Sequence, residues 1–264
     1  MIYKAVSHIH STISYDGKVS LSEIATLSKE SGVEVVCITE HSDYLDLDDV
    51  HNLISECREY SDDSLLLVPG LEVPHADGHV LVIGIDDEIK SLNPLSVIEQ
   101  YKDTAFIVFP HPHRSSFIIS DVLLGRLDAI EVWNSQYDGK RYPRSRSLRY
   151  VRRVQQRGSG VGVFAGLDFH RRSHWGGPRI EIEAAGATQK EITRALKRGD
   201  YRIVGAGVEI SSEGEVGGRA LWKIEIVGSL YVFITSLFKQ LSQVLHAVGI
   251  RPPQGIKEWL RRNI

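Results

Sequence analysis

Residues 3–10 read YKAVSHIH, a short apolar run that ends in two histidines separated by a single residue. The apolar part has the length and the residue types of a β-strand. The histidines follow at the point where the strand would end. The same arrangement, an apolar run followed by His, Asp or Glu, recurs along the chain. This stretch therefore gives the first indication of both the fold and the site.

Further apolar runs follow the first one, and most are continuous instead of alternating with polar residues. They lie at 35–39, 65–68, 80–83, 106–109, 129–132, 161–165 and 202–204. Continuous runs are typical of strands buried on both faces of a parallel sheet. Helix signals separate several of them: capping boxes at Ser20 and Thr188, and helical patterns at 49–60 and 147–157. The alternation predicts an α/β fold, with a barrel favoured over an open sheet.

The pattern changes near residue 207, so we expect a barrel domain over 1–207 and an extension over 208–264. Residues 211–219 are polar and glycine-rich, which indicates a linker. Residues 230–248 have apolar side chains at helical spacing. We expect this C-terminal helix to dock on the barrel or to lie in a homo-oligomer interface. A membrane-surface or partner-binding helix is the alternative.

Composition restricts the class of protein. The chain has 264 residues and a formal net charge of -3, so no overall basic field indicates nucleic-acid binding. The N-terminus does not resemble a signal peptide, and no apolar stretch is long enough to span a membrane. Cys37 and Cys57 are predicted to be free thiols. We expect a soluble cytoplasmic protein.

Candidate metal ligands stand at the ends of the apolar runs. They are His8, His10, His41, Glu72, His79, His111, Asp168 and His170. The carboxyl ends of barrel strands share one rim, so these side chains should converge. In an extended segment, positions i and i+2 point the same way, which suits both His8 with His10 and Asp168 with His170. Imidazole and carboxylate groups favour Zn, Mn or Fe, and two such ions can hold a hydroxide and clamp a phosphoryl group.

Five short motifs resemble those of the PHP (polymerase and histidinol phosphatase) family of metal-dependent phosphoesterases. HIHSTISYDG at 8–17 resembles HxHT followed by SDG, and ITEH at 38–41 resembles TDH. PGLEV at 69–73, followed by His79, resembles the G-x-E element and its histidine; FPHP at 109–112 and LDFH at 167–170 resemble A-H-P and D-x-H. All stand in the family's order. Glu40 replaces the usual Asp and Ser7 the usual acid, which affects the surroundings of the ligands more than the ligands themselves.

The resemblance implies a distorted (β/α)7 TIM-like barrel with two or three divalent ions (Zn, Mn or Fe). One ion would take His8, His10, Glu72 and Asp168. A second would share Glu72 and take His79 and His111. A third would be held by Asp16, His41 and His170. The alternative for Asp16 is a turn residue before Gly17.

Cationic side chains follow three of the predicted strands and indicate phosphate binding. They are Arg114, then Lys140, Arg141, Arg144 and Arg146, and finally Arg171 and Arg172. We expect a metal-bound hydroxide to attack phosphorus while Arg114, Arg171 or Arg172 holds the oxygens. His113 or His174 would protonate the leaving oxygen, and Glu131 and Asn134 would organise the surroundings of the ligands or the substrate loop. The alternative for each arginine is that it is a solvated loop residue without a role in binding. The alternative for His113 is that it has a structural role in its loop.

The expected activity is hydrolysis of a phosphate ester in a small metabolite, a nucleotide or an oligonucleotide. One alternative is a metal-dependent amidohydrolase. Those barrels also begin with H-x-H but use a metal-bridging lysine, and no lysine stands at a candidate strand end here. The other alternative is a non-catalytic binding or regulatory domain that is stabilised by metal.

Overall fold

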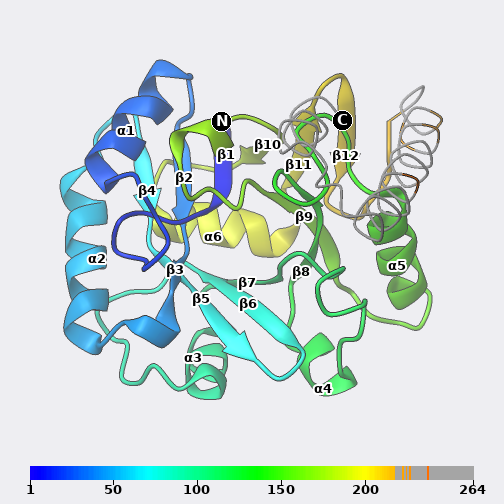
Figure 1. The fold of residues 1–264 in the computed structure, drawn as a ribbon, viewed down its shortest axis with the longest axis horizontal. Helices are drawn as coiled ribbons and strands as arrows, with labels where there is room; N and C mark the ends of the chain where they lie inside the picture. Colours follow the sequence, from blue (N-terminus) through cyan, green and yellow to red (C-terminus); the bar gives the residue numbers. More distant parts are fainter. Residues whose placement is uncertain (218–221, 223, 225, 227–236, 238–264) are drawn as a thin grey trace, which may run out of the picture.

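The computed structural model of the chain describes residues 1–217 and, beyond them, Trp222, Ile224, Ile226 and Leu237. The predicted helix over 230–248 lies, apart from Leu237, outside these described residues. The described part is a mixed α/β fold, as the sequence predicts (Figure 1).

The first half of the chain contains β1 (Ile2–Ile9), α1 (Leu21–Glu30), β2 (Val35–Ile38), β3 (Glu40–His41), η1 (Ser42–Tyr44), α2 (Leu47–Glu59), β4 (Leu66–Val68), β5 (Gly70–His75), β6 (Gly78–Ile83), α3 (Pro94–Tyr101) and β7 (Phe106–Phe109). There follow α4 (Asp121–Leu124), β8 (Ala129–Asn134), α5 (Ser145–Gln155), β9 (Gly162–Gly166), η2 (Arg172–His174), β10 (Arg179–Glu183), α6 (Gln189–Arg198), β11 (Tyr201–Gly205) and β12 (Val208–Ser211). All eight predicted strands are present, and so are the four helices predicted before residue 200. The strands and α-helices without a sequence prediction are β5, the short β3 and β12, α3 and α4, and β10, whose residues alternate between more exposed and buried positions.

The strands form two six-stranded sheets, ordered β12-β11-β10-β1-β2-β4 and β3-β5-β6-β7-β8-β9. Two chain segments run through both sheets. β2 continues into β3 across Thr39, and β4 continues into β5 across Pro69. The helices lie around the outside of the two sheets (Figure 1). This arrangement brings the ends of β1, β3, β5, β7 and β9 toward one region.

The closed barrel that the sequence suggested is wrong, because no ladder joins β1 to β9 in the described residues. The segment directly after β9 meets β1 only through one isolated bridge, Ile9 with Phe169, and a few backbone hydrogen bonds. His8 has a φ of 61° and Asp168 a φ of 51°. Left-handed residues interrupt an extended strand, so regular pairing cannot continue here. The strands are also not all parallel, since β6 is antiparallel to both of its neighbours.

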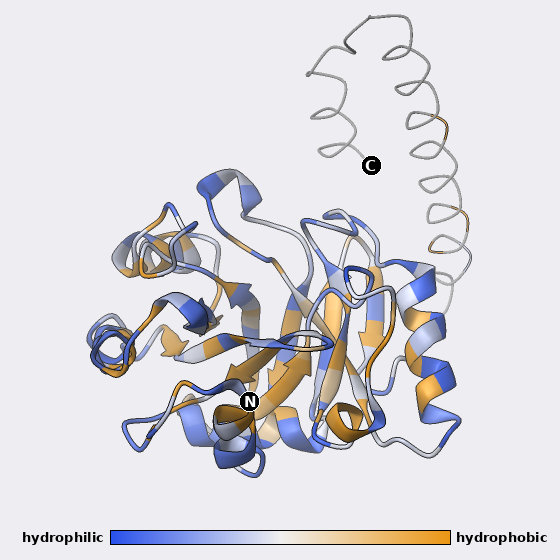
Figure 2. Ribbon diagram, turned by 60° about the horizontal axis from the view of Figure 1, so that its bottom comes forward, coloured by the Kyte–Doolittle hydropathy of each residue, from blue (hydrophilic) through white to orange (hydrophobic). Residues whose placement is uncertain are grey.

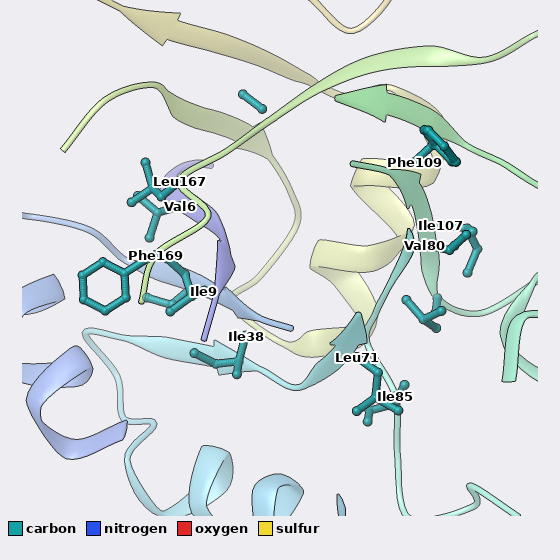
Figure 3. Packing of buried hydrophobic residues seen from close by; sticks show 14 of the residues in the cluster. Val6, Ile9, Ile38, Leu71, Val80, Ile85, Ile107, Phe109, Leu167 and Phe169 are labelled. Carbon is teal, nitrogen blue, oxygen red and sulfur yellow. The ribbon is translucent and has the colours of Figure 1, made fainter. Parts of the chain in front are cut away.

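A continuous apolar core holds the strand ends in place. Val6, Ile9, Leu167 and Phe169 lie close together beneath the crossing of β1 and the segment after β9 (Figure 3). The strands are apolar and the outer surfaces of the helices are largely hydrophilic (Figure 2). The side chain of Trp133 is fully buried, and its Nε1 donates to the Gly139 carbonyl at 2.9 Å. Interiors of this kind are close-packed, so side chains that project from the strand ends are held rigidly.

Local sequence explains the helix ends. The capping box of Ser20 and Glu23 opens α1, and Gly199, with a φ of 77°, ends α6. β12 pairs with β11, so residues 208–211 are part of the first sheet. Cys37 and Cys57 are buried free thiols, as predicted. In the described part of the chain, no helix combines the length and apolar character needed to cross a membrane.

Candidate metal centre

Glu72, from β5, lies at the centre of the predicted ligands, and its side chain is 2% exposed. Its Oε2 lies 3.2 Å from Nε2 of both His8 and His10. Its Oε1 lies 2.6 Å from Nδ1 of His79 and 3.2 Å from Nε2 of His111. The two carboxylate oxygens thus face two different pairs of histidines, which is the arrangement of a carboxylate that can bridge two ions.

Asp168 reaches the same cluster from the segment after β9. Its Oδ1 lies 3.7 Å from Nε2 of His8 and 4.0 Å from Nε2 of His10. The sequence argument relied on strand alternation to bring these side chains together. In the structure His8, in β1, and Asp168, in the segment after β9, are left-handed, so local breaks in the extended backbone, and not alternation, direct them inward. Convergence was correctly predicted, but for a different geometric reason.

Asp16, His41 and His170 form a third group at the edge of the cluster. Oδ2 of Asp16 lies 3.0 Å from Nε2 of His170 and 3.7 Å from Nε2 of His41. The rings of His41 and His170 each stack on His10, with centroids 4.4 Å apart in both cases. His10 therefore connects this group with the one around Glu72.

Ligand atoms in this cluster lie at spacings that a metal ion can span. Four sets of three have their ligand atoms within 4.8 Å of one another: His10, His41 and His170; His8, His10 and Glu72; His8, His111 and Asp168; and Glu72, His79 and His111. Nε2 of His10 and Oδ1 of Asp16 are buried and have no hydrogen-bond partner of good geometry in the described residues. Buried polar atoms are nearly always satisfied. These orphaned atoms and a donor set of imidazole and carboxylate fit divalent cations.

Glu131, from β8, supports the ligands from behind. It is 1% exposed, and its Oε1 lies 3.1 Å from Nδ1 of His8. Its Oε2 accepts from the backbone N–H of His111 and from Nδ2 of Asn134, both at 2.8 Å. A carboxylate that holds the second nitrogen of a ligating histidine fixes the tautomer and orientation of the ring. The structure thus places Glu131 and Asn134 around the ligands, in the arrangement that the sequence analysis expected.

Glu40 organises the loop between His10 and Asp16. It is fully buried and accepts from the backbone N–H groups of Ser11 at 2.8 Å and Ser14 at 3.1 Å. The Ser14 hydroxyl also donates to Glu40 and accepts from the His41 N–H at 3.0 Å. Burial raises the pKa of the Glu40 carboxyl. Nothing in the sequence identified Ser14, because its importance lies in contacts with distant residues.

The site favours positive charge at its centre. Burial opposes protonation of His8, but the carboxylates of Asp168, Glu72 and Glu131 outweigh it and raise the pKa of the imidazole. Burial also opposes ionisation of Glu72, but His8 and the other histidines hold the pKa of that carboxyl well below its ordinary value. Burial and the neighbouring His10 lower the pKa of His41 to about 4. Buried carboxylates concentrated in this way favour the binding of cations.

Two cavities flank the cluster. One, of about 430 Å³, is lined by residues that include His79, His111 and Arg114. The other, of about 650 Å³, is lined by Asp16, Lys18, Gln136, Tyr137, Arg144, Asp168, His170, Arg171 and His174. A further cavity of about 570 Å³ beside α5 contains none of the predicted ligands. The two flanking cavities are the routes by which a substrate could reach the centre.

The predicted substrate-binding arginines are only partly brought together. Arg171 lines the larger cavity and Arg114 the smaller one, where its guanidinium lies 5.6 Å from the centroid of the Tyr137 ring. Arg172 instead binds Glu23 of α1 at 3.0 Å, with its side chain 68% exposed, and lines neither flanking cavity. The sequence analysis did not identify Lys18 or Tyr137, which line the larger cavity.

The two predicted acids, His113 and His174, lie beside the cavities. The ring of His113 is 4.8 Å from that of Tyr137, and Nδ1 of His174 accepts from the backbone N–H of His170 at 3.3 Å. Burial and Arg144 lower the pKa of His113 to about 4, and burial and Arg171 lower the pKa of His174 to about 4. Both imidazoles are therefore neutral near pH 7.

Comparison with known proteins agrees with this geometry. Residues 7–115 match the family model described as the PHP domain. Over these residues the chain is similar to the PHP domain. The match confirms the resemblance seen in the motifs and includes seven of the predicted ligands, whereas Asp168 and His170 lie beyond it. The matched stretch thus contains most of the cluster around Glu72.

Individual relatives are distant. A stretch of 45 residues is 42% identical to a "probable histidinol-phosphatase" of Thermotoga maritima, but it spans 17% of this chain and only 19% of the length of that relative. A two-domain protein of Bacteroides vulgatus that contains a predicted PHP-like metal-dependent phosphoesterase superposes with a TM-score of 0.60 at 17% identity, over 80% of this chain and 67% of that one. PsfC of Pseudomonas syringae superposes with a TM-score of 0.53 at 17% identity, over 87% and 97% of the two chains. These two likenesses show a shared fold.

Proposed function

We propose that this chain is a metal-dependent phosphoesterase that hydrolyses a phosphate ester of a small metabolite, a nucleotide or an oligonucleotide. The observation that carries the proposal is the position of Glu72, whose two oxygens face two separate pairs of histidines beneath two cavities. The PHP domain match over 7–115 supports the same class of hydrolase.

The proposed ligand sets follow the three groups in the structure. The first set is His8, His10, Glu72 and Asp168; the second is Glu72, His79 and His111; the third is Asp16, His41 and His170. Bound Zn, Mn or Fe would neutralise phosphoryl oxygens and make water a stronger acid. The nitrogen and oxygen donors suit all three metals and do not distinguish among them.

The residues around the centre would bind and orient the phosphate. Arg171 and Arg114 approach from opposite cavities, and a guanidinium suits two phosphoryl oxygens at once. Neutral imidazoles at His113 and His174 would first act as hydrogen-bond donors. The negative charge of a bound phosphate would raise the pKa of both rings, and only then would either ring be suited to protonate the leaving oxygen.

The decisive experiment measures chelator-sensitive turnover. Protein reconstituted with Zn, Mn or Fe is assayed with p-nitrophenyl phosphate and with its bis ester, before and after chelation. His10→Gln should lower turnover by more than about 100-fold, because it removes a proposed ligand of the first set whose ring also stacks on His41 and His170 of the third. The matched control is His51→Gln on α2, outside the cluster, which should keep wild-type turnover.

The outcomes separate the competing functions. Turnover of an amide substrate without turnover of either phosphate ester would favour an amidohydrolase. Stoichiometric metal binding without any turnover would favour a non-catalytic, metal-stabilised domain. Equal activity in His10→Gln and the wild-type protein would contradict the proposed centre altogether. A panel of phosphorylated metabolites and short oligonucleotides would then define the substrate.

Three further aspects of the protein stay proposals. The first is a division near residue 207 between the body and a C-terminal extension. The second is homo-oligomerisation through residues 230–248, which size-exclusion chromatography with light scattering would test. The third is a cytoplasmic location, which two buried free thiols support.

A further inference from the structure

Two tyrosines lie exposed and in contact beside the metal centre. Tyr15, in the loop after β1, is 58% exposed, and Tyr44, in η1, is 63% exposed. Their ring centroids are 4.3 Å apart, with planes inclined at 47°. A single exposed aromatic ring is unremarkable on a protein surface, but paired exposed rings at a candidate site offer an apolar surface for a ligand.

The pair is adjacent to the candidate ligands of the third metal group. The ring centroid of Tyr15 is 5.3 Å from that of His41. The next residue, Asp16, lies 3.0 Å from Nε2 of His170. A group attached to a phosphate at the centre would therefore reach the tyrosines through a short linker.

The loop that carries Tyr15 is held rigidly. Glu40 accepts from the N–H groups of Ser11 and Ser14, and the Gly17 N–H donates to the Ser14 carbonyl at 3.2 Å. The loop is so tight that a Cβ on Gly17 would lie 1.7 Å from the Ser11 carbonyl oxygen. The backbone on both sides of Tyr15 is thus held in place before any ligand binds, which lowers the entropic cost of binding.

Charge around the centre is asymmetric. Asp43, which is not a proposed ligand, acts electrostatically on the Tyr15 side chain, whereas Arg114 and Arg171 line the two cavities. A carboxylate beside the tyrosines disfavours an anionic group there and favours a neutral or cationic one. Phosphoryl oxygens are favoured on the arginine sides.

We propose that Tyr15 and Tyr44 form a stacking subsite for a planar aromatic or heteroaromatic ring, neutral or cationic, on the alcohol side of the phosphate ester. This subsite rests on the proposed function and narrows its substrate class to esters whose leaving alcohol carries such a ring. Ring stacking on aromatic side chains is sequence-tolerant and depends on the π-face, so a phenyl ring, an imidazole or a nucleobase would each fit.

The test compares three substrates in four variants. Phenyl phosphate and adenosine 5′-monophosphate carry a ring, and glycerol 1-phosphate does not. Tyr15→Ala and Tyr44→Ala should each lower kcat/KM for the ring-bearing esters roughly tenfold, mainly through KM, and change glycerol 1-phosphate by less than about twofold. Tyr15→Phe keeps the ring and should behave as the wild-type protein. Leu95→Ala, at a position 63% exposed on α3, is the matched control.

The comparison also separates the two ring sources. If Tyr15→Ala affects adenosine 5′-monophosphate but not phenyl phosphate, the subsite is reached only by a base one sugar away; the reverse result assigns it to rings joined directly to the ester. An equal loss for all three esters, or no loss for any, would overturn the subsite.

A binding measurement keeps the subsite testable even if none of the esters is hydrolysed. Calorimetry with the metal-reconstituted protein compares phenylphosphonate with methylphosphonate, neither of which has a cleavable ester bond. The subsite predicts roughly tenfold tighter binding of phenylphosphonate and loss of that difference in Tyr15→Ala. Equal affinities of the two phosphonates, together with equal binding of adenosine 5′-monophosphate by Tyr15→Ala and the wild-type protein, would refute the subsite, whereas absent turnover with retained ring preference would refute only the hydrolytic function.

Discussion

Substitution of Gly166 by alanine should damage the metal centre without touching a ligand. Gly166 is the last residue of β9, directly behind the cluster. An added Cβ would lie 2.1 Å from Oε1 of Glu131 and 2.6 Å from Cβ of His8. Both side chains are buried, so neither can move into solvent. Glycine is therefore required at position 166 because the side chains of Glu131 and His8 leave no room for a Cβ atom.

The expected magnitude follows from what the two side chains hold. Glu131 is bonded to His8, to the His111 N–H and to Asn134, so a shift of its carboxylate disturbs all of these contacts. Overpacking of a buried site typically costs about 1–3 kcal/mol of unfolding free energy. Displacement of a residue that orients a metal ligand typically lowers metal affinity roughly 10- to 100-fold. Gly166→Ala should show both effects.

Two assays measure these effects separately. Urea denaturation of metal-free protein gives the change in unfolding free energy, and competition with a chromophoric chelator gives the zinc affinity. Gly160→Ala is the matched control, because its Cβ would meet no atom within 4 Å. The control should leave both values unchanged.

Wild-type zinc affinity and stability in Gly166→Ala would refute the reasoning. That result would mean that Glu131 and His8 do not occupy the positions described here. A loss of stability with unchanged zinc affinity would instead show that the contact is structural and does not control the ligands.

Other predictions concern the same cluster. Glu131→Gln keeps the size of the side chain but leaves one oxygen for three donors, and zinc affinity should fall roughly 10- to 100-fold in the chelator competition assay. Asp16→Asn should lower the metal content of purified protein by one ion per chain, measured by plasma mass spectrometry, because Asp16 contacts only the third group; loss of all ions would contradict the three-group arrangement. The pKa values of His113 and His174 are about 4 in the folded protein and 6.5 ordinarily, so the unfolded chain takes up these protons first as the pH falls. Metal-free protein should therefore lose stability between pH 6.5 and about 4, by about 1 kcal/mol at pH 5 for each half-buried ring after solvent screening. His174→Asn should make the urea midpoint depend less on pH over that range. An unchanged dependence of the midpoint on pH would rule out His174 as one of its sources.

The sequence by itself indicated which histidines and carboxylates would gather, although Glu72 lies within β5 and His79 near the start of β6 instead of at a carboxyl end. Apolar runs have to be buried, and short polar positions directly after them can lie only at the edge of the sheets, so His8, Glu72 and Asp168 could be grouped without coordinates. The capping box of α1, the N-cap of α6 at Thr188 and the terminal glycine of α6 were predictable for a similar reason, since their signals are local.

Only the tertiary structure decided how the segments meet. A closed barrel was expected, yet left-handed residues at His8 and Asp168 interrupt pairing between β1 and the segment after β9. Arg172 was expected at the phosphate, yet it pairs with Glu23 on α1. Contacts of this kind join residues far apart in the chain, and they depend on the packing of whole elements, so no local pattern in the sequence records them.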